Sequence, residues 1–315
     1  MAFKIGSVNG VSQLAHYNML QAIHDFLTAD AALVAAGQQW TVLRYDTVSA
    51  NRELILQGSG LSGTEQLFIG VRTYQSEPGD FYNLAFATFT GFLAGNPFDS
   101  QPGARLSGVP AHNNAIDYWM VGNGQRLAVA MKVGTPVYMS GYVGKMFPYA
   151  RPTQFPSPLI NAGMLIGVQN TRFSDASIVM PYKGTRSNFA LRNKANLWIT
   201  PDVYPWNNTR VIAGNGTAAT LLNLRDTGGY YHPMRVEPND NSPNVYGFLD
   251  GIFYITGFNN AVENVMQVGG TVVDQTGLTV AQAVAAIIAA GGRAFVVIQD
   301  SARTGPSDYY AMEMA

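Results

Sequence analysis

The chain contains no cysteine and few charged residues. Among its 315 residues are 19 Lys and Arg and 20 Asp and Glu, which give a formal net charge of −1. The absence of cysteine excludes disulfide scaffolds, thiolate metal sites and cysteine nucleophiles. Balanced charge and a pI near 6.4 provide no basic surface for nucleic acid or for an anionic membrane. We therefore expect no recognition of nucleic-acid sequence and no membrane partner.

Long apolar runs are also missing. No stretch reaches the roughly 18–20 apolar residues that a membrane-spanning helix needs. The opening residues, MAFKIGSVNGVSQ, lack the apolar core of a secretory signal. Charged residues make up 12% of the chain and apolar residues 47%, so a globular fold with a weakly charged surface is expected. Because surface charge normally keeps copies of a protein apart, this composition favours a subunit that buries surface against partners.

Two helices stand out from the hydrophobic periodicity. Apolar residues recur at three- and four-residue steps from Leu14 to Leu27, which predicts an N-terminal helix with Ser12 as its N-cap. A short helical turn is expected over residues 30–36. Residues 280–290 form one further apolar helix, which begins after a threonine N-cap and ends at a glycine pair.

Strand signals dominate the rest of the chain. The 33 glycines, 16 tyrosines and 16 phenylalanines fit many strands joined by tight turns. Residues 82–93 could form a strand or a short helix, and periodicity alone leaves both open. Strands are expected at 40–45, 53–57, 67–74, 176–180, 188–191, 197–200, 210–213, 294–299 and 309–314. Hairpins are expected at 116–121 with 126–133, at 245–249 with 252–256, and at 266–268 with 272–273.

The predicted fold class is α+β and β-rich. We expect an α+β domain over residues 1–145, with the N-terminal helix and an antiparallel sheet. A proline-rich extended connector follows at 146–160, where four prolines forbid a helix. Residues 161–315 are expected to form a mainly β domain, sandwich- or barrel-like, with the helix at 280–290. The polar segment 95–114 is predicted to be a long loop, removable without loss of the fold but needed for assembly.

One glycine motif matches the sequence pattern of dinucleotide-binding loops. Residues 58–63, GSGLSG, match G-x-G-x-x-G and follow a strand. A phosphate-binding turn must open a helix, because the helix N-terminus holds the pyrophosphate. Here the chain leads directly into another strand signal, LFIGVRTY, so we interpret the motif as a hairpin loop.

No catalytic, metal or cofactor residues are predicted. His16 and His24 lie two helical turns apart instead of the one turn of a zinc pair, and His112 and His232 are expected in separate loops. Residues 237–244, EPNDNSPN, offer oxygen ligands but lack the regular spacing and closing Glu of a calcium loop. The carboxylates Asp250, Glu263, Asp274 and Asp300 are assigned to turns, although a spatial pair for glycoside hydrolysis stays open. The sequons at Asn207 and Asn215 have no meaning without secretion.

Three stretches together resemble a family of tailed-bacteriophage virion structural proteins. They are residues 40–74, residues 116–159, and residues 246–264 combined with the terminal FVVIQDSARTGPSDYYAMEM. The resemblance implies a tail- or neck-associated structural protein located in the virion and assembled in the host cytoplasm. It implies no catalytic residues and no cofactor. Relative to that family, the helix at 280–290 is interpreted as an insertion between two C-terminal strands.

The sequence therefore predicts a non-enzymatic structural subunit. We expect a homo-oligomeric ring at the neck, tail-completion position or tail end, in contact with other virion proteins. The alternative is a baseplate or tail-tip protein that binds a host receptor or glycan through exposed aromatic side chains. An envelope-degrading hydrolase is a third hypothesis and requires a carboxylate pair in a cleft.

Overall fold

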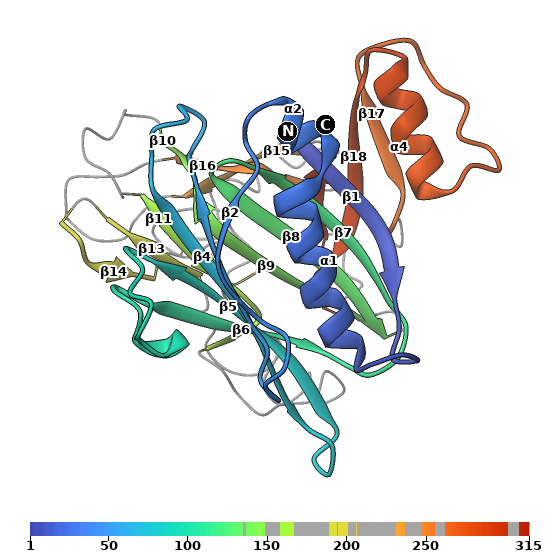
Figure 1. Ribbon diagram of the computed structural model, residues 1–315. Helices are drawn as coiled ribbons and strands as arrows, with labels where there is room; N and C mark the ends of the chain where they lie inside the picture. Colours follow the sequence, from blue (N-terminus) through green and yellow to red (C-terminus); the bar gives the residue numbers. More distant parts are fainter. Residues whose placement is uncertain are drawn as a thin grey trace.

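Antiparallel strands form most of the structure. The computed structural model describes residues 1–134, 137–148, 158–166, 189–193, 195–200, 206, 231–236, 247–255, 262–301 and 309–314. Their strands form three sheets, with helices near the two ends of the chain (Figure 1). The predicted β-rich α+β class, with antiparallel sheets, an N-terminal helix and a C-terminal helix, is confirmed. Within the described ranges, no helix is long and apolar enough to span a bilayer.

The first sheet has seven strands in the order β1-β7-β8-β9-β11-β13-β14. Their bounds are β1 Ala2–Val8, β7 Ile116–Asn123, β8 Arg126–Gly134, β9 Val137–Lys145, β11 Leu159–Ala162, β13 Phe189–Arg192 and β14 Trp198–Ile199. The hairpin predicted between residues 116 and 133 is confirmed as β7 and β8. Its turn is closed by Asn123, whose side-chain oxygen accepts from the Gln125 N–H at 3.0 Å.

The second and third sheets have six strands each. The second runs β12 Leu165–Ile166, β6 Arg105–Ala111, β5 Phe81–Phe89, β4 Leu67–Ser76, β3 Glu53–Gly58 and β2 Thr41–Asp46. The third runs β10 Phe147–Pro148, β16 Gly247–Ile255, β19 Tyr309–Glu313, β18 Arg293–Gln299 and β17 Val265–Val268, with β15 Tyr231–Val236 paired to β16.

The first sheet is the middle layer of a three-layer stack. Strand β8 is buried along nearly its whole length, as expected for a strand covered on both faces. On one face Arg126 of β8 binds Asp250 of β16 in the third sheet. On the other face Phe86 of β5 and Val109 of β6 lie so close to Gly141 of β9 that an added Cβ would sit 2.4 Å from the phenylalanine ring. The core is thus continuous across all three sheets.

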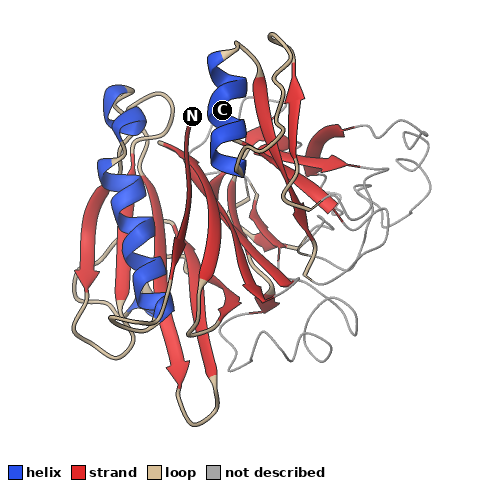
Figure 2. Cartoon of the chain, turned by 90° about the vertical axis from the view of Figure 1, so that its right-hand side faces the viewer, coloured by secondary structure: helices blue, strands red, loops and turns tan. Residues whose placement is uncertain are grey.

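Helix α1 (Ala15–Ala29) contacts β1 and β7 of the first sheet and β4 and β5 of the second, and Figure 2 shows it lying against the strands. Its predicted apolar stripe is confirmed, with Leu20, Ile23 and Leu27 fully buried. The predicted N-cap, Ser12, is wrong: the Ala15 N–H donates instead to the side-chain oxygen of Asn113, 98 residues away, at 2.8 Å. The short helix α2 (Ala31–Ala35) follows and is capped by the Asp30 carboxylate.

Helix α4 (Val280–Ala289) lies on an excursion between two neighbouring strands. Strands β17 and β18 pair directly, and residues 269–292 leave and re-enter the sheet between them. We call residues 269–292 the C-terminal arm. Thr279 and Gln282 form the capping box that begins α4, and Gly291, at φ +76°, ends it. The predicted helix is confirmed, whereas the predicted hairpin partner of residues 266–268 is wrong, because β17 pairs with β18 and not with 272–273.

Two further predictions from local sequence are corrected. Residues 82–93 contain strand β5, which settles the open choice between strand and helix. The loop predicted at 95–114 instead holds a 3₁₀ turn (Phe98–Ser100) and strand β6, whose Pro110 lies opposite Asn83 of β5. Phe98 is fully buried against Phe89. Deleting residues 98–112 would therefore remove part of the core, so these residues are not a dispensable assembly loop.

The hairpin predicted around Asp250 and Gly251 is also wrong. Strand β16 includes both residues, although Gly251 adopts φ +71° and the pairing with β15 shifts register across them. Strands from both sides of the connector predicted at 146–160 share sheets, since β11 pairs with β9 and β12 pairs with β6. Predicted strands 188–191 and 197–200 correspond to β13 and β14. Predicted strands 176–180 and 210–213, the sequons and residues 237–244 lie outside the described residues.

Candidate assembly surfaces

The glycine motif at 58–63 is a turn between β3 and β4, as interpreted from the sequence. The Gly60 N–H donates to the Gly124 carbonyl at 2.8 Å, which joins this turn to the β7–β8 turn. A Cβ on Gly58 would lie 2.6 Å from that carbonyl oxygen and 2.8 Å from the Trp40 ring. The glycines therefore allow two turns to pack closely, and no helix follows that could hold a phosphate.

The three histidines whose side chains are described lie apart from one another. His16 is buried, and its Nε2 is 3.1 Å from the Gln75 side-chain oxygen. Desolvation by burial lowers the pKa of His16 to about 4. His24 stacks on Tyr45, and the ring of His112 accepts from the Asn114 N–H. Across the described ranges, no group of three or more His, Asp or Glu side chains could hold a metal ion.

Asp250 belongs to a buried polar cluster that the sequence analysis missed. Its Oδ2 accepts from the Arg126 Nε at 3.0 Å and from the Asn123 Nδ2 at 2.7 Å. Burial acts to lower the pKa of Arg126, but the charge and hydrogen bond of Asp250, together with the nearby Tyr142 and Glu313, leave that pKa raised. Arg126 also donates to the Val121 carbonyl at 3.0 Å. The cluster joins the middle sheet to the third sheet.

Glu263 joins the same two layers at another point. Its carboxylate lies 2.6 Å from the Lys132 Nζ and accepts from the Tyr138 hydroxyl at 2.6 Å. Desolvation, followed by that hydrogen bond, raises the pKa of Tyr138. Two of the carboxylates assigned to turns from the sequence, Asp250 and Glu263, are therefore held in contacts between sheets.

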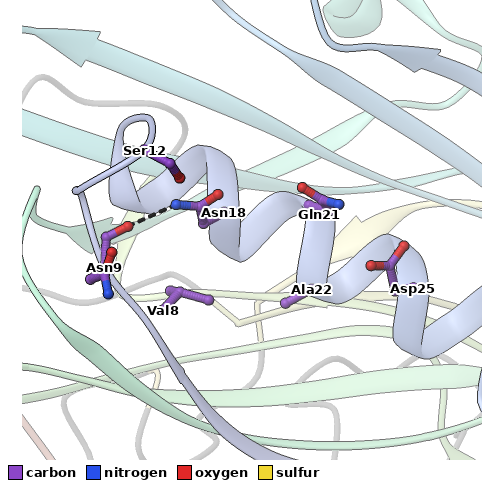
Figure 3. A pocket seen from close by; sticks show the side chains of 7 residues that line it. All are labelled: Val8, Asn9, Ser12, Asn18, Gln21, Ala22 and Asp25. Atoms are coloured by element: carbon purple, nitrogen blue, oxygen red, sulfur yellow. Dashed lines mark hydrogen bonds between the residues drawn. The ribbon is translucent and has the colours of Figure 1, made fainter.

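A shallow groove of about 340 Å³ lies between β1 and α1 (Figure 3). Val8 and Ala22 face each other across its floor, and the Asn18 side chain donates to the Asn9 carbonyl at 2.7 Å. Asp25 is the one carboxylate in its lining. The groove therefore does not present the carboxylate pair that glycoside hydrolysis requires.

The C-terminal arm projects from the sheets and carries little charge. Figure 1 shows it extending beyond the sheets, with residues 269–279 passing along the outer side of α4. Asp274 is the single charged residue among residues 269–292. Val272 is 88% exposed and Leu278 is 39% exposed. Exposed apolar side chains on an element with so little charge are typical of a surface that is covered in an assembly.

The outer strands of the sheets differ in how well they are protected from pairing. Strand β2 carries Arg44 and Asp46 and a bulge between Val42 and Arg44, features that disfavour pairing with another chain. Strand β1 is different, since all seven of its residues pair in unbroken register with β7 and Lys4 is its one charged residue. Edge strands of this kind are ready templates for an added strand.

Exposed aromatic side chains, which the glycan-binding alternative requires, are missing from the part of the chain that the structure describes. Every Phe, Tyr and Trp there whose side chain is described is buried or half-buried, and the exposed large apolar residues are Met, Val and Leu. Comparison with known proteins finds no matching family model and no curated relative.

Proposed function

We propose that this protein is a non-enzymatic structural subunit of a tailed-bacteriophage virion. It forms a ring at the neck, at the tail-completion position or at the tail end, and assembles in the host cytoplasm. The observation that carries the proposal is the C-terminal arm, which projects from the sheets with one charge in 24 residues and with Val272 almost fully exposed. The sequence resemblance to virion structural proteins supports the same conclusion.

The mechanism of such a subunit is complementarity of shape and of strand edges. Three sheets share one continuous core, and a buried ion pair joins the first sheet to the third, so the body of the subunit is closely packed. Surfaces that differ from one another, here an arm and a strand edge, make head-to-tail contacts between copies. Head-to-tail contacts close into rings when the rotation between neighbours divides a full turn.

Negative-stain microscopy of the purified full chain tests this proposal. We expect closed particles with a single rotational symmetry. A glycan array on the same sample tests the alternative, because a receptor-binding protein would bind sugars as a discrete small oligomer or monomer. Fields of single 34.0 kDa particles at every concentration would contradict the ring.

A further inference from the structure

In the outer segment of the C-terminal arm, residues 271–275, bonded and unbonded backbone N–H groups alternate. The Thr271 N–H donates to the Ala290 carbonyl at 3.0 Å, and the Val273 N–H donates to the Gln267 side-chain oxygen at 3.0 Å. The N–H groups of Val272 and Asp274 have no partner within the described part of the chain. In a β-strand, alternate residues direct their backbone groups to opposite sides, so as a strand this segment would present both free N–H groups along one edge.

The residues of this segment suit a strand. Its sequence, TVVDQ, begins with three β-branched residues, which favour extended backbone. Val272 is 88% exposed although it is apolar. The segment nevertheless pairs with no strand among the described residues. It therefore has the composition and the free backbone groups of a strand that lacks its neighbour.

Strand β1 offers the matching edge. It is the last strand of the first sheet, and its side away from β7 has no strand partner in the described ranges. Phe3, Ile5 and Val8 are half-buried, so an added strand would cover apolar surface as well as backbone groups. Strand addition of this kind gives affinity through main-chain hydrogen bonds.

The charges of the two segments are complementary. Lys4 is the one charged residue of β1, and Asp274 is the one charged residue of the arm. Both side chains are exposed, and neither forms an ion pair with a described residue. Opposite charges facing each other across paired strands stabilise the pairing, and like charges weaken it.

From these observations we infer that residues 271–275 of one copy add as a strand to the free edge of β1 in the neighbouring copy. The occupant of the β1 edge is thus a second copy of this chain, and Lys4 of one copy faces Asp274 of the next. This inference rests on the proposed function, because it names the contact that closes the ring. Each copy donates one arm and accepts one arm, so the contact is head-to-tail.

Charge reversal tests the contact. We expect Lys4→Asp and Asp274→Lys each to lower the association constant of the full chain by about tenfold, and the double variant to restore most of it. Glu77→Lys, at an exposed position in the β4–β5 turn, is the matched control and should leave association unchanged. Unchanged association in both single variants, or no recovery in the double variant, would overturn the inference.

Cross-linking distinguishes this contact from assembly in general. The chain has no cysteine, so single cysteines can be placed at will. On oxidation, a mixture of the Lys4→Cys and Asp274→Cys variants should give a linked heterodimer. A mixture of Val48→Cys, at a 94% exposed loop position, with Asp274→Cys should not. Rings without the specific cross-link would overturn the inference and leave the proposed function intact, whereas a monomer without any cross-link would contradict both.

Discussion

At the scale of single residues, buried charge joins the layers. Arg126 is fully buried, and its guanidinium binds the Asp250 carboxylate and the Val121 carbonyl. Burying two charges costs desolvation free energy that a solvent-exposed pair does not lose. A buried pair is therefore tolerated only where hydrogen bonds satisfy both side chains. The pair therefore favours the one arrangement in which β8 and β16 bring these side chains together.

Removing the negative partner should be costly. We expect Asp250→Asn to lower the free energy of unfolding by about 3 kcal/mol, because the guanidinium would stay buried without a counter-charge. Glu77→Gln, which removes an exposed carboxylate, is the control and should change stability very little. Denaturant titration of both variants measures the difference. Equal stabilities would show that Arg126 finds another partner or reaches water.

His16 should make stability depend on pH. Burial lowers its pKa in the fold to about 4 from an unfolded value of 6.5, so the unfolded chain binds a proton first as the pH falls. The stability that the fold gains from keeping His16 neutral is present in full above pH 6.5. As the pH falls from 6.5 to 4, the free energy of unfolding decreases by about 3 kcal/mol. The ring nitrogen Nδ1 has no hydrogen-bond partner in the described structure, which explains why a proton there is unfavourable.

The variants that test this effect are His16→Gln and, as a control, Gln21→Ala. His16→Gln should flatten the fall in unfolding free energy between pH 6.5 and 4, because glutamine does not titrate there. Gln21→Ala, at an exposed position of the same helix, removes no titratable group and should leave the slope unchanged. Unfolding curves at several pH values check both. An unchanged slope in His16→Gln would assign the pH dependence to other groups.

At the scale of elements, local sequence predicts the helices, but it does not always predict the residues that cap them. The periodicity predicted α1, yet its N-terminal N–H is satisfied by Asn113, which follows β6 far along the chain. By contrast, the cap of α4 is entirely local, because Thr279 and Gln282 lie three residues apart. A local motif can be recognised in the sequence, whereas a cap supplied by another element requires the fold.

Two variants compare the N-cap expected from the sequence, Ser12, with the acceptor that the structure shows, Asn113. Asn113→Ala should lower the free energy of unfolding by about 1 kcal/mol, because it leaves the Ala15 N–H without its acceptor. Ser12→Ala should have almost no effect, since Ser12 is exposed and does not cap the helix. Chemical denaturation measures both. A larger loss in Ser12→Ala than in Asn113→Ala would restore the cap expected from the sequence.

Strand predictions failed where a turn signal occurred inside a strand. Asp250 and Gly251 resemble a hairpin turn, but both lie inside β16. The strand is irregular there, and the neighbouring strands and the Arg126 pair hold it in the sheet. Likewise the glycines and prolines of 95–114 suggested a loop, and β6 forms there because β5 supplies a full partner edge. Tertiary pairing overrides local propensity in both cases.

At the scale of the whole molecule, burial on both faces of the middle sheet was not visible in the sequence. Most residues of strands β7, β8 and β9 are buried, although each strand includes polar or charged residues, and the sequence does not show which sheets cover them. The pairing of β11 with β9 also carries the first sheet across the predicted connector. Such partners are distant in sequence, and composition alone cannot reveal them. The proposed assembly contact could not be predicted from the sequence for the same reason, because the edge strands of a sheet can be identified only from its strand order.

Copies of this chain are expected to assemble with one another, and the native mass of the full chain should be measured over a range of concentrations. We expect an oligomer with a mass that is a whole-number multiple of 34.0 kDa, and its fraction should grow at the expense of the monomer as the concentration rises. Reversing the charge of Lys4 or Asp274 should shift this equilibrium toward the monomer. A single 34.0 kDa species at all concentrations would show that the chain does not assemble with itself.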